Sequence, residues 1–499
     1  MTFISITYGL FLLVFLGIYW SMKSPSGQLW ILLIGSLTFY ASLQIQYIPL
    51  LLAITLINFY LGRAIGANLA PGRQNTKKWQ SAQKSWNQRR LQLLWLGVLL
   101  NVICLVSFKY VPFILSNIAA PLNLPVVEES ASWISTYLIA PLGISFFTFE
   151  CIAYLIDVYR GAPATKQLLQ FTAYKLYFPK LISGPITRYH QFTGGLKNLQ
   201  FPTLDRVTEG LWLITCGAVK KALLGDRLGI LVDLCFGNLE RAGSGDLWLA
   251  IFAYGLQLYL DFSGYVDIAR GTAVLMGINL PENFDFPYFS TSIADFWRRW
   301  HMTLGDWIRN YLYFPLGGSR KGLSRTCLNL VIVMLITGIW HGAAWGFLVW
   351  GGLHGLALVI HRLTDAVANG LNWVKLWWQS WIGVLVAWFL TQSMVFVSWI
   401  FFRLPKLSQA TLAVQHLWGQ PADIQFAQKV YIEAIGLGRL QIAFLIGILV
   451  ALMTLVYFFY RGLKLQLNWS VKLLLMPLGL YTVWVLAPQG GQPYIYFDF

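Results

Sequence analysis

The stretch Leu328–Ile360, LNLVIVMLITGIWHGAAWGFLVWGGLHGLALVI, decides the fold class of this chain. It contains no Asp, Glu, Lys or Arg, and apolar runs lie on both sides of His341. A helix needs about 20 mostly apolar residues to cross a bilayer, so this stretch indicates helices in a membrane. Backbone groups in a bilayer must be satisfied by helices or closed barrels, and no strand-type alternation occurs here. We therefore predict helices.

The composition of the whole chain has the same character. Of its 499 residues, 57% are hydrophobic and 11% are charged, whereas soluble domains carry roughly 25% charged residues. A chain this poor in charge cannot cover a water-facing surface, which excludes a soluble enzyme, a secreted disulfide scaffold and a disordered protein. Five scattered cysteines show no metal-ligand spacing and are expected to be buried apolar side chains.

Other apolar runs bring the expected number of crossings to eleven or twelve. We therefore predict an all-α polytopic membrane protein. The runs are Met1–Trp20, Leu29–Leu43, Ile45–Leu61, Leu91–Ile114, Trp133–Ile156, Val207–Leu234, Leu247–Tyr265, Leu328–Trp340, Trp345–Ile360, Trp381–Phe402, Ile442–Tyr460 and Val471–Leu486.

Basic residues gather in a loop without acids after the third apolar run. Loops rich in Lys and Arg stay in the cytoplasm. Counted back across three crossings, the N-terminus is expected to be extracytoplasmic and Lys23 cytoplasmic. Much of the net charge of +16 then comes from Lys and Arg residues that set the orientation of the protein in the membrane, so no nucleic acid partner is expected. The basic residues of the loop are Arg63, Arg73, Lys77, Lys78, Lys84, Arg89 and Arg90.

Two stretches depart from the pattern of plain spans. Tyr174–Phe192 is apolar but interrupted by Pro179 and by Gly184-Pro185, which predicts a re-entrant or interfacial element. Residues 261–320 combine many polar and aromatic side chains. Irregular backbone at membrane depth is tolerated where it is buried in protein or lines a wet cavity. A cavity near residues 261–320 is therefore the first indication of function.

His341 is an ionisable residue in an apolar run, which by default suggests a function. Desolvation favours its neutral imidazole, which can accept a proton as a general base. Gly338, Gly342 and Gly346 fall at four-residue intervals around it, and such small residues also allow close helix packing. From the spacing alone, packing and catalysis remain equally good interpretations.

His301 lies in Ser292–Gly318, SIADFWRRWHMTLGDWIRNYLYFPLGG, which we predict to form an amphipathic helix. One interpretation is anchoring at the lipid headgroups. The other is that Arg298 and Arg299 bind an anionic donor, since guanidinium groups match phosphates well. Its aromatic side carries Trp297, Trp300, Trp307 and Tyr311.

Several other chemistries lack their residues. His354 and His361 share a helix face but have no nearby carboxylate or cysteine, so we predict no metal site. Neither a phosphate loop, nor a GxSxG elbow, nor a dinucleotide fingerprint is present, which argues against ATP hydrolysis, serine hydrolysis and hydride transfer.

A series of motifs in the second half of the chain resembles the membrane-bound O-acyltransferases. Within them it resembles the alginate O-acetylation branch of bacterial polysaccharide acetyltransferases more than the D-alanyl transferases of teichoic acid. The motifs are PLGISFFTFE (Pro141–Glu150), YFPKLISGPITRY (Tyr177–Tyr189), DFSGYVDIARG (Asp261–Gly271), the stretch Gly277–Gly322, GIWHGAAWGFLVWGGLHG (Gly338–Gly355), SWIFFR (Ser398–Arg403) and the terminal YIYFDF.

This resemblance implies a fold and a set of roles. The expected fold is a single transmembrane domain, 1–499, with helices around a central funnel or tunnel. Its parts are the N-terminal spans and basic loop (1–110), the core with the motifs (141–403) and the C-terminal spans (440–499). His341 of the WHG motif maps onto the essential histidine, expected to act as general base, and His301 of the RRWH motif onto a supporting one.

The resemblance also implies an acetyl donor and partners. We expect cytoplasmic acetyl-CoA as the donor, bound with Arg298, Arg299 and Trp300, and no bound cofactor or metal. The expected location is a bacterial inner membrane, with a separate SGNH-like extracytoplasmic protein that passes the acetyl group to a polysaccharide. Three positions depart from the family pattern by losing polar or charged side chains: Val266, Gly305 and Asn310.

Other functions remain open at this point. Within the enzymes, the alternative is D-alanyl transfer from a carrier protein to teichoic acid. Outside them, the chain would be a lipid or polysaccharide transporter with histidines as proton relays, or a structural subunit of an export complex. Few acids inside the spans and no repeated halves argue against the transporter.

Overall fold

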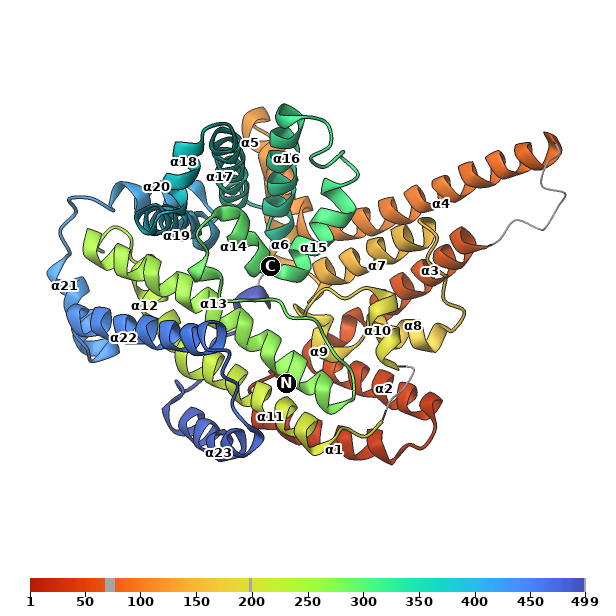
Figure 1. Ribbon diagram of the computed structural model, residues 1–499, viewed down its shortest axis with the longest axis horizontal. Coiled ribbons are helices and arrows are strands. Elements are labelled where there is room, and N and C mark those ends of the chain that lie inside the picture. Colours follow the sequence, from red (N-terminus) through yellow and green to blue (C-terminus); the bar gives the residue numbers. More distant parts are fainter. Residues whose placement is uncertain (68–76, 197–199, 498–499) are drawn as a thin grey trace. The chain divides into compact units, whose positions relative to one another are not determined.

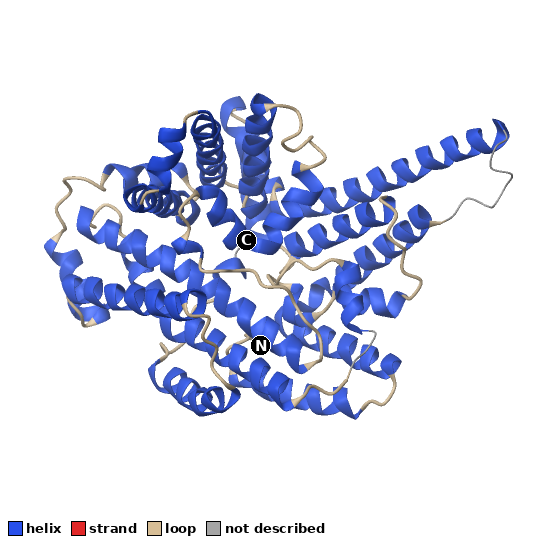
Figure 2. Ribbon diagram, viewed as in Figure 1, coloured by secondary structure: helices blue, strands red, loops and turns tan. Residues whose placement is uncertain are grey.

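The computed structural model describes residues 1–67, 77–196 and 200–497. Within these residues every regular element is a helix (Figure 2), which confirms the predicted all-α class. The chain divides into two compact units: unit 1 comprises Met1–Gly210 and Ala269–Pro281, and unit 2 comprises Leu211–Ile268 and Glu282–Phe499. The expectation of a single domain stays a prediction.

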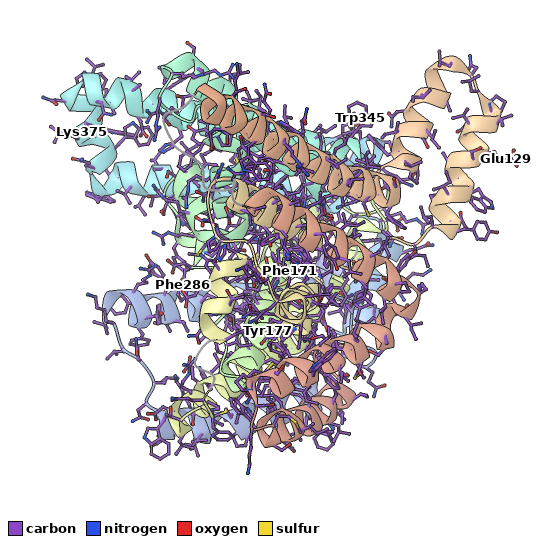
Figure 3. All side chains as sticks on the ribbon, turned by 90° about the vertical axis from the view of Figure 1, so that its right-hand side faces the viewer. Glu129, Phe171, Tyr177, Phe286, Trp345 and Lys375 are labelled. Carbon is purple, nitrogen blue, oxygen red and sulfur yellow. The ribbon has the colours of Figure 1, made fainter. Side chains whose placement is uncertain are left out.

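Unit 1 is built on the first ten helices. The long helix α4 packs on α7 and α3, and α5 packs on α6 (Figure 1). Side chains of the core such as Phe171 and Tyr177 lie inside this unit, whereas Glu129 lies on the outlying pair α5 and α6 (Figure 3). The helices are α1 (Ile6–Ser21), α2 (Pro25–Gln44), α3 (Ile48–Gly66), α4 (Lys77–Lys109), α5 (Val111–Leu122), α6 (Pro125–Tyr137), α7 (Ile144–Tyr159), α8 (Leu168–Lys175), α9 (Phe178–Leu181) and α10 (Tyr189–Leu196).

The basic loop predicted after the third apolar run is helical over its second half. Helix α4 starts at Lys77, so that Lys84, Arg89 and Arg90 lie on its first turns. Arg73 lies outside the described residues. The structure thus corrects the loop prediction, because the chain is helical from Lys77 onward.

The broken apolar stretch Tyr174–Phe192 is confirmed as irregular. It holds the end of α8, the short α9 and the start of α10, and most of its side chains are buried in unit 1. A Cβ at Gly184 would lie 2.2 Å from the Cα of Lys180, so only glycine fits this turn.

Unit 2 contains most of the later helices, and α11 (Leu204–Ala218) and α13 (Ser244–Leu275) each run across a unit boundary. Its other helices are α12 (Asp226–Phe236), α14 (Ile293–Arg299), α15 (Met302–Ile308), α16 (Leu323–His341), α17 (Trp345–Gly370), α18 (Asn372–Gln379), α19 (Trp381–Arg403), α20 (Leu407–Gln415), α21 (Ile424–Ala427), α22 (Arg439–Tyr457) and α23 (Trp469–Leu486). Short 3-10 turns are η1 (Ile45–Tyr47), η3 (Pro287–Phe289) and η7 (Ile495–Phe497), and π-helical segments are η2 (Val219–Gly225), η4 (Arg309–Tyr313), η5 (Gln428–Ile435) and η6 (Phe458–Gly462).

The chain is a multi-pass membrane protein. Seven helical stretches among the described residues are long and apolar enough to cross a bilayer, and the apolar α1 is shorter. The sequence predicted eleven or twelve crossings. Part of the difference is one of counting, because the predicted runs Leu29–Leu43 and Ile45–Leu61 both lie in the single stretch Pro25–Gly66. The rest arises where an apolar run is broken, as Trp133–Ile156 is between α6 and α7, or where a helix carries buried charges, as α13 does. The seven stretches are Pro25–Gly66, Gln83–Lys109, Leu323–His341, Trp345–Gly370, Trp381–Arg403, Arg439–Gly462 and Trp469–Leu486.

All five cysteines are free thiols. Cys151 and Cys235 are buried, as expected, whereas the other three are half-buried: Cys104, Cys216 and Cys327.

Candidate active site

His341 is the last residue of α16, where this helix packs closely on α17. A Cβ at Gly338 would lie 2.3 Å from the carbonyl oxygen of Phe347, and one at Gly351 would lie 2.5 Å from that of Met334. At Gly342 it would meet the ring of Phe347 at 2.1 Å. Close packing is therefore seen at Gly338 and Gly342, whereas Gly346 lies on α17 and its Cβ would meet the backbone of Phe401 and Pro405 at 2.7 Å. The three glycines do not share one helix face, because α16 ends at His341.

Aromatic rings surround the imidazole of His341, which is only 2% exposed. The ring centroids lie 4.9 Å away for Trp340, 5.1 Å for Trp350, 5.0 Å for Phe402 and 5.9 Å for Tyr496. The imidazole is therefore enclosed by aromatic rings of the same unit.

His301 is the residue at which the predicted amphipathic helix breaks. The structure has two helices here, α14 and α15, and His301 between them adopts φ +45°. A non-glycine residue in this left-handed region is strained, and such strain is concentrated at functional sites. The prediction of one continuous helix is wrong, because this turn interrupts it.

Asn283 holds the ring of His301. Its Oδ1 lies 3.2 Å from Nδ1 of His301 and also accepts hydrogen bonds from the backbone N–H and the hydroxyl of Thr303, at 3.0 and 2.9 Å. Because this oxygen only accepts, Nδ1 of His301 carries the proton and Nε2 has the lone pair. Burial lowers the pKa of His301 to about 3, so the imidazole is neutral near pH 7.

The two histidines contact the same two rings. Trp340 lies 4.9 Å from His341 and 6.3 Å from His301, and Tyr496 lies 5.9 and 6.0 Å from them. The structure therefore brings together the two histidines that the sequence singled out. Tyr496 belongs to the terminal motif YIYFDF, whose residues the sequence alone gives no role. Residues 498 and 499 of that motif lie outside the described residues.

A buried group of three charged side chains, Lys221, Asp226 and Asp261, holds the C-terminal segment beside the histidines. We call it the Lys221 cluster. Nζ of Lys221 lies 2.8 Å from Asp226 and 2.5 Å from Asp261. It donates to the carbonyl of Pro493 at 3.0 Å, and the N–H of Ile495 donates to Asp261 at 3.1 Å.

The residue that follows Asp261 continues this link into the site. The ring of Phe262 stacks on that of Tyr496 at 3.9 Å and lies 4.9 Å from His301. Lys221 itself lies in the π-helical segment η2, and such segments often occur at functional sites.

The three residues predicted to bind the donor have different surroundings. Arg298 and Arg299 both face Asp295, with Nε–Oδ distances of 3.7 and 2.9 Å, and the side chain of Arg298 is 67% exposed. Trp300 is 2% exposed and packs against other aromatic rings, including Phe296 at 5.5 Å. The aromatic side of this region therefore faces the protein interior.

The other two histidines of this region have ordinary structural partners. Nδ1 of His354 accepts from Nε1 of Trp297 at 3.2 Å, and its Nε2 lies 2.9 Å from Oγ of Ser398. Nε2 of His361 lies 3.4 Å from Asp365, so the expectation that His361 has no carboxylate nearby is wrong. No group of three potential metal ligands occurs within the ranges that the structure describes.

Comparison with known proteins identifies the family. The sequence model of the membrane-bound O-acyltransferase family matches residues 38–402, which include His301 and His341. The chain belongs to this family. It is accordingly an O-acyltransferase.

Three kinds of enzyme are found among the relatives that are similar to this chain in sequence. A probable alginate O-acetylase of Pseudomonas putida is 34% identical over 98% of both chains. A peptidoglycan O-acetyltransferase of Helicobacter pylori is 32% identical over 79% of this chain and 74% of its own. A teichoic acid D-alanyltransferase of Streptococcus thermophilus is 30% identical over 49% of this chain and 62% of its own. The resemblance to the alginate O-acetylation branch is therefore confirmed.

Proposed function

We propose that this O-acyltransferase transfers an acetyl group from cytoplasmic acetyl-CoA for the O-acetylation of an extracellular polysaccharide. The observation that supports the proposal most directly is the pair of buried histidines on the shared rings of Trp340 and Tyr496. The similarity to a probable alginate O-acetylase over nearly the whole chain supports the acetyl group and the polysaccharide.

In the proposed mechanism His341 is the general base. It accepts the proton of an acceptor hydroxyl while the hydroxyl oxygen attacks the thioester carbonyl. The tetrahedral intermediate then collapses and the C–S bond breaks. The sulfur takes the proton back from His341, and CoA leaves as the free thiol. Aromatic walls keep water from competing for the thioester.

His301 has a supporting role in this mechanism. Its Nδ1 is held by Asn283, and the turn at φ +45° fixes the direction of the ring. We assign it to orienting the donor or stabilising the developing oxyanion. Arg298 and Arg299 are assigned to attracting the phosphates of the donor, and Trp300 to supporting them from within the aromatic core.

The topology completes the proposal. The basic residues of α3 and α4 lie in the cytoplasm, the N-terminus lies outside it, and a separate extracytoplasmic SGNH-like protein receives the acetyl group for the polysaccharide. The setting is a bacterial inner membrane.

The test compares two buried histidines, using radiolabelled acetyl-CoA and the purified protein. His341→Ala is expected to lower acetyl transfer by about 10²- to 10⁴-fold, the usual contribution of a general base, with little change in the melting temperature. His354→Ala is the matched control, because His354 is equally buried but hydrogen-bonded to Ser398 and Trp297. The melting temperature of His354→Ala is expected to fall, whereas the acetyl transfer rate of the protein that remains folded should fall little.

Equal transfer by the wild type and His341→Ala would contradict the assignment of the base. Transfer of D-alanine from a carrier protein in place of acetyl would favour the teichoic acid alternative. Movement of an intact substrate without a covalent product would favour a transporter.

A further inference from the structure

Unit 1 contains a pocket of about 770 Å³ that the proposed reaction does not use. Its walls are the end of α3, the first turns of α4, the end of α7 and the segment 161–166 that follows α7. A volume of this size fits a small organic group rather than a bare ion. The lining residues are Arg63, Ile65, Gly66, Ala67, Gln83, Trp86, Arg90, Val158, Gly161, Ala162, Pro163, Ala164, Thr165 and Lys166.

The walls of this pocket are held by contacts within unit 1. Arg90 donates to the carbonyls of Ile65 and Tyr159, both at 2.8 Å, and so joins the C-terminal ends of α3 and α7. The segment 161–166 packs tightly on α3, because a Cβ at Gly66 would lie 2.6 Å from that of Ala164. The pocket is therefore a built feature of the fold.

The charge of the pocket is positive. Three cationic side chains line it, namely Arg63, Arg90 and Lys166, and none of the described lining residues is acidic. Arg90 is occupied by helix carbonyls, whose partial negative charge it offsets. Arg63 and Lys166 are exposed, and no carboxylate among the described residues forms an ion pair with either of them. The pocket thus offers two cations to an anionic ligand.

The position of the pocket indicates the source of that ligand. It lies at the ends of the apolar stretches Pro25–Gly66 and Gln83–Lys109, where membrane helices reach the headgroup layer. Trp86 in its wall is a residue type typical of this layer. Basic pockets between helices at this level bind the phosphates of lipid headgroups.

We infer that this pocket binds a phosphate-bearing polar group, with the headgroup of an anionic phospholipid as the source that its position favours. The guanidinium of Arg63 is suited to bidentate contact with phosphate oxygens, and Lys166 adds a second charge. Neither histidine of the candidate active site lines the pocket, and the inference does not depend on the proposed acetyl transfer.

The experiment measures lipid binding to the full-length protein in detergent by native mass spectrometry. The probes are phosphatidylglycerol, with phosphatidylcholine for comparison, and adenosine 3′,5′-bisphosphate as a soluble phosphate compound. Arg63→Gln with Lys166→Gln is expected to weaken phosphatidylglycerol binding about ten-fold or more, as the loss of two cations near a headgroup predicts. Arg90 is left in place because its removal would disturb the fold.

The matched control is Lys23→Gln with Lys84→Gln, which removes two exposed positive charges that do not line the pocket. It is expected to bind phosphatidylglycerol like the wild type. Tight binding of the bisphosphate that the pocket variant loses would identify a soluble phosphate ligand instead of a lipid. Equal phosphatidylglycerol binding by the wild type and the pocket variant, or equal binding of phosphatidylcholine, would overturn the inference.

Discussion

Each unit of the molecule buries a group of three charged side chains, and the two groups have opposite charge balance. In unit 1 the three side chains are Glu150, Lys175 and Lys180. Nζ of Lys175 lies 3.3 Å and Nζ of Lys180 lies 2.5 Å from the carboxylate of Glu150, so two lysines share one carboxylate. We call this the Glu150 cluster. In unit 2 the Lys221 cluster has one lysine between two carboxylates. All six side chains are at most 7% exposed.

The partners of the two clusters differ as well. The Glu150 cluster joins α7, α8 and α9, and Glu150 also accepts from the N–H of Thr187 at 3.2 Å. Its bonds therefore remain within unit 1, between α7 and the broken stretch Tyr174–Phe192. The Lys221 cluster instead binds the C-terminal segment that carries Tyr496 to the histidines. The difference suggests that the first cluster stabilises the fold, whereas the second also positions part of the candidate active site.

The largest effect is expected from Glu150→Gln. This change leaves two buried lysines without a carboxylate, and an uncompensated buried charge typically costs about 3 to 5 kcal/mol. The variant is therefore expected to accumulate poorly and to melt at a much lower temperature in detergent, as measured by thermal unfolding of the purified protein.

Lys180→Met is the matched control for that prediction, because Lys175 remains paired with Glu150 at a one-to-one ratio. Its melting temperature should lie between those of the wild type and Glu150→Gln. A Glu150→Gln protein as stable as the wild type would show that the cluster does not hold unit 1 together.

Asp261→Asn is expected to affect activity more than stability. Lys221 keeps Asp226 as its partner, so the loss of stability should be smaller than for Glu150→Gln. The link to Ile495 is weakened, which loosens the segment that carries Tyr496. Acyl transfer is expected to fall at least ten-fold, and limited proteolysis should cut the C-terminal segment faster.

Asp226→Asn makes the same change of charge on the other side of Lys221 and serves as the control. Asp226 accepts from the backbone N–H of Gln492 at a longer distance, 3.4 Å, and lies further along the chain from Phe262. Its transfer rate should fall less. Equal losses in both variants would mean that the total charge of the cluster matters, rather than the contact to Ile495.

The features that depend on neighbouring residues in the sequence could be predicted from it. Apolar runs such as Leu328–Trp340 correspond to membrane helices, and prolines and glycines marked the broken stretch Tyr174–Phe192. The break between α6 and α7 has a similar local signal, Pro141 followed by Gly143, and Gly143 adopts φ +78°. That signal could have divided the predicted span Trp133–Ile156.

Features that depend on contacts between residues far apart in the chain could not be predicted from the sequence. The aromatic and charged periodicity continues through His301, whereas the break in the helix there goes with bonds to Asn283. Tyr496 meets the histidines only through the folded C-terminal segment. Neither charged cluster could be assembled from spacing, because Lys221 and Asp261 lie on separate helical segments.

The smallest effect is expected from Gln492→Ala, at the start of the C-terminal segment. The side-chain amide of Gln492 donates to Asp233 at 2.8 Å, and Asp233 has a side chain that is 51% exposed and a second partner in Arg403. Hydrogen bonds to charged groups contribute about 1.5 to 3 kcal/mol, and the exposure of this carboxylate to water places the bond at the lower end of that range. We therefore expect a slightly lower melting temperature and a transfer rate within about two-fold of the wild type.

This variant distinguishes the two ends of the segment. If the Lys221 cluster holds the C-terminal segment, the protease should cut the segment in the Gln492→Ala variant at close to the wild-type rate. That rate should be well below the rate in the Asp261→Asn variant. If Gln492→Ala instead releases the segment as strongly as Asp261→Asn, the exposed bond to Asp233 carries the attachment. The buried charges of unit 2 would then serve the fold of their own helices, as those of the Glu150 cluster do, and the contrast between the two clusters would reduce to their charge balance.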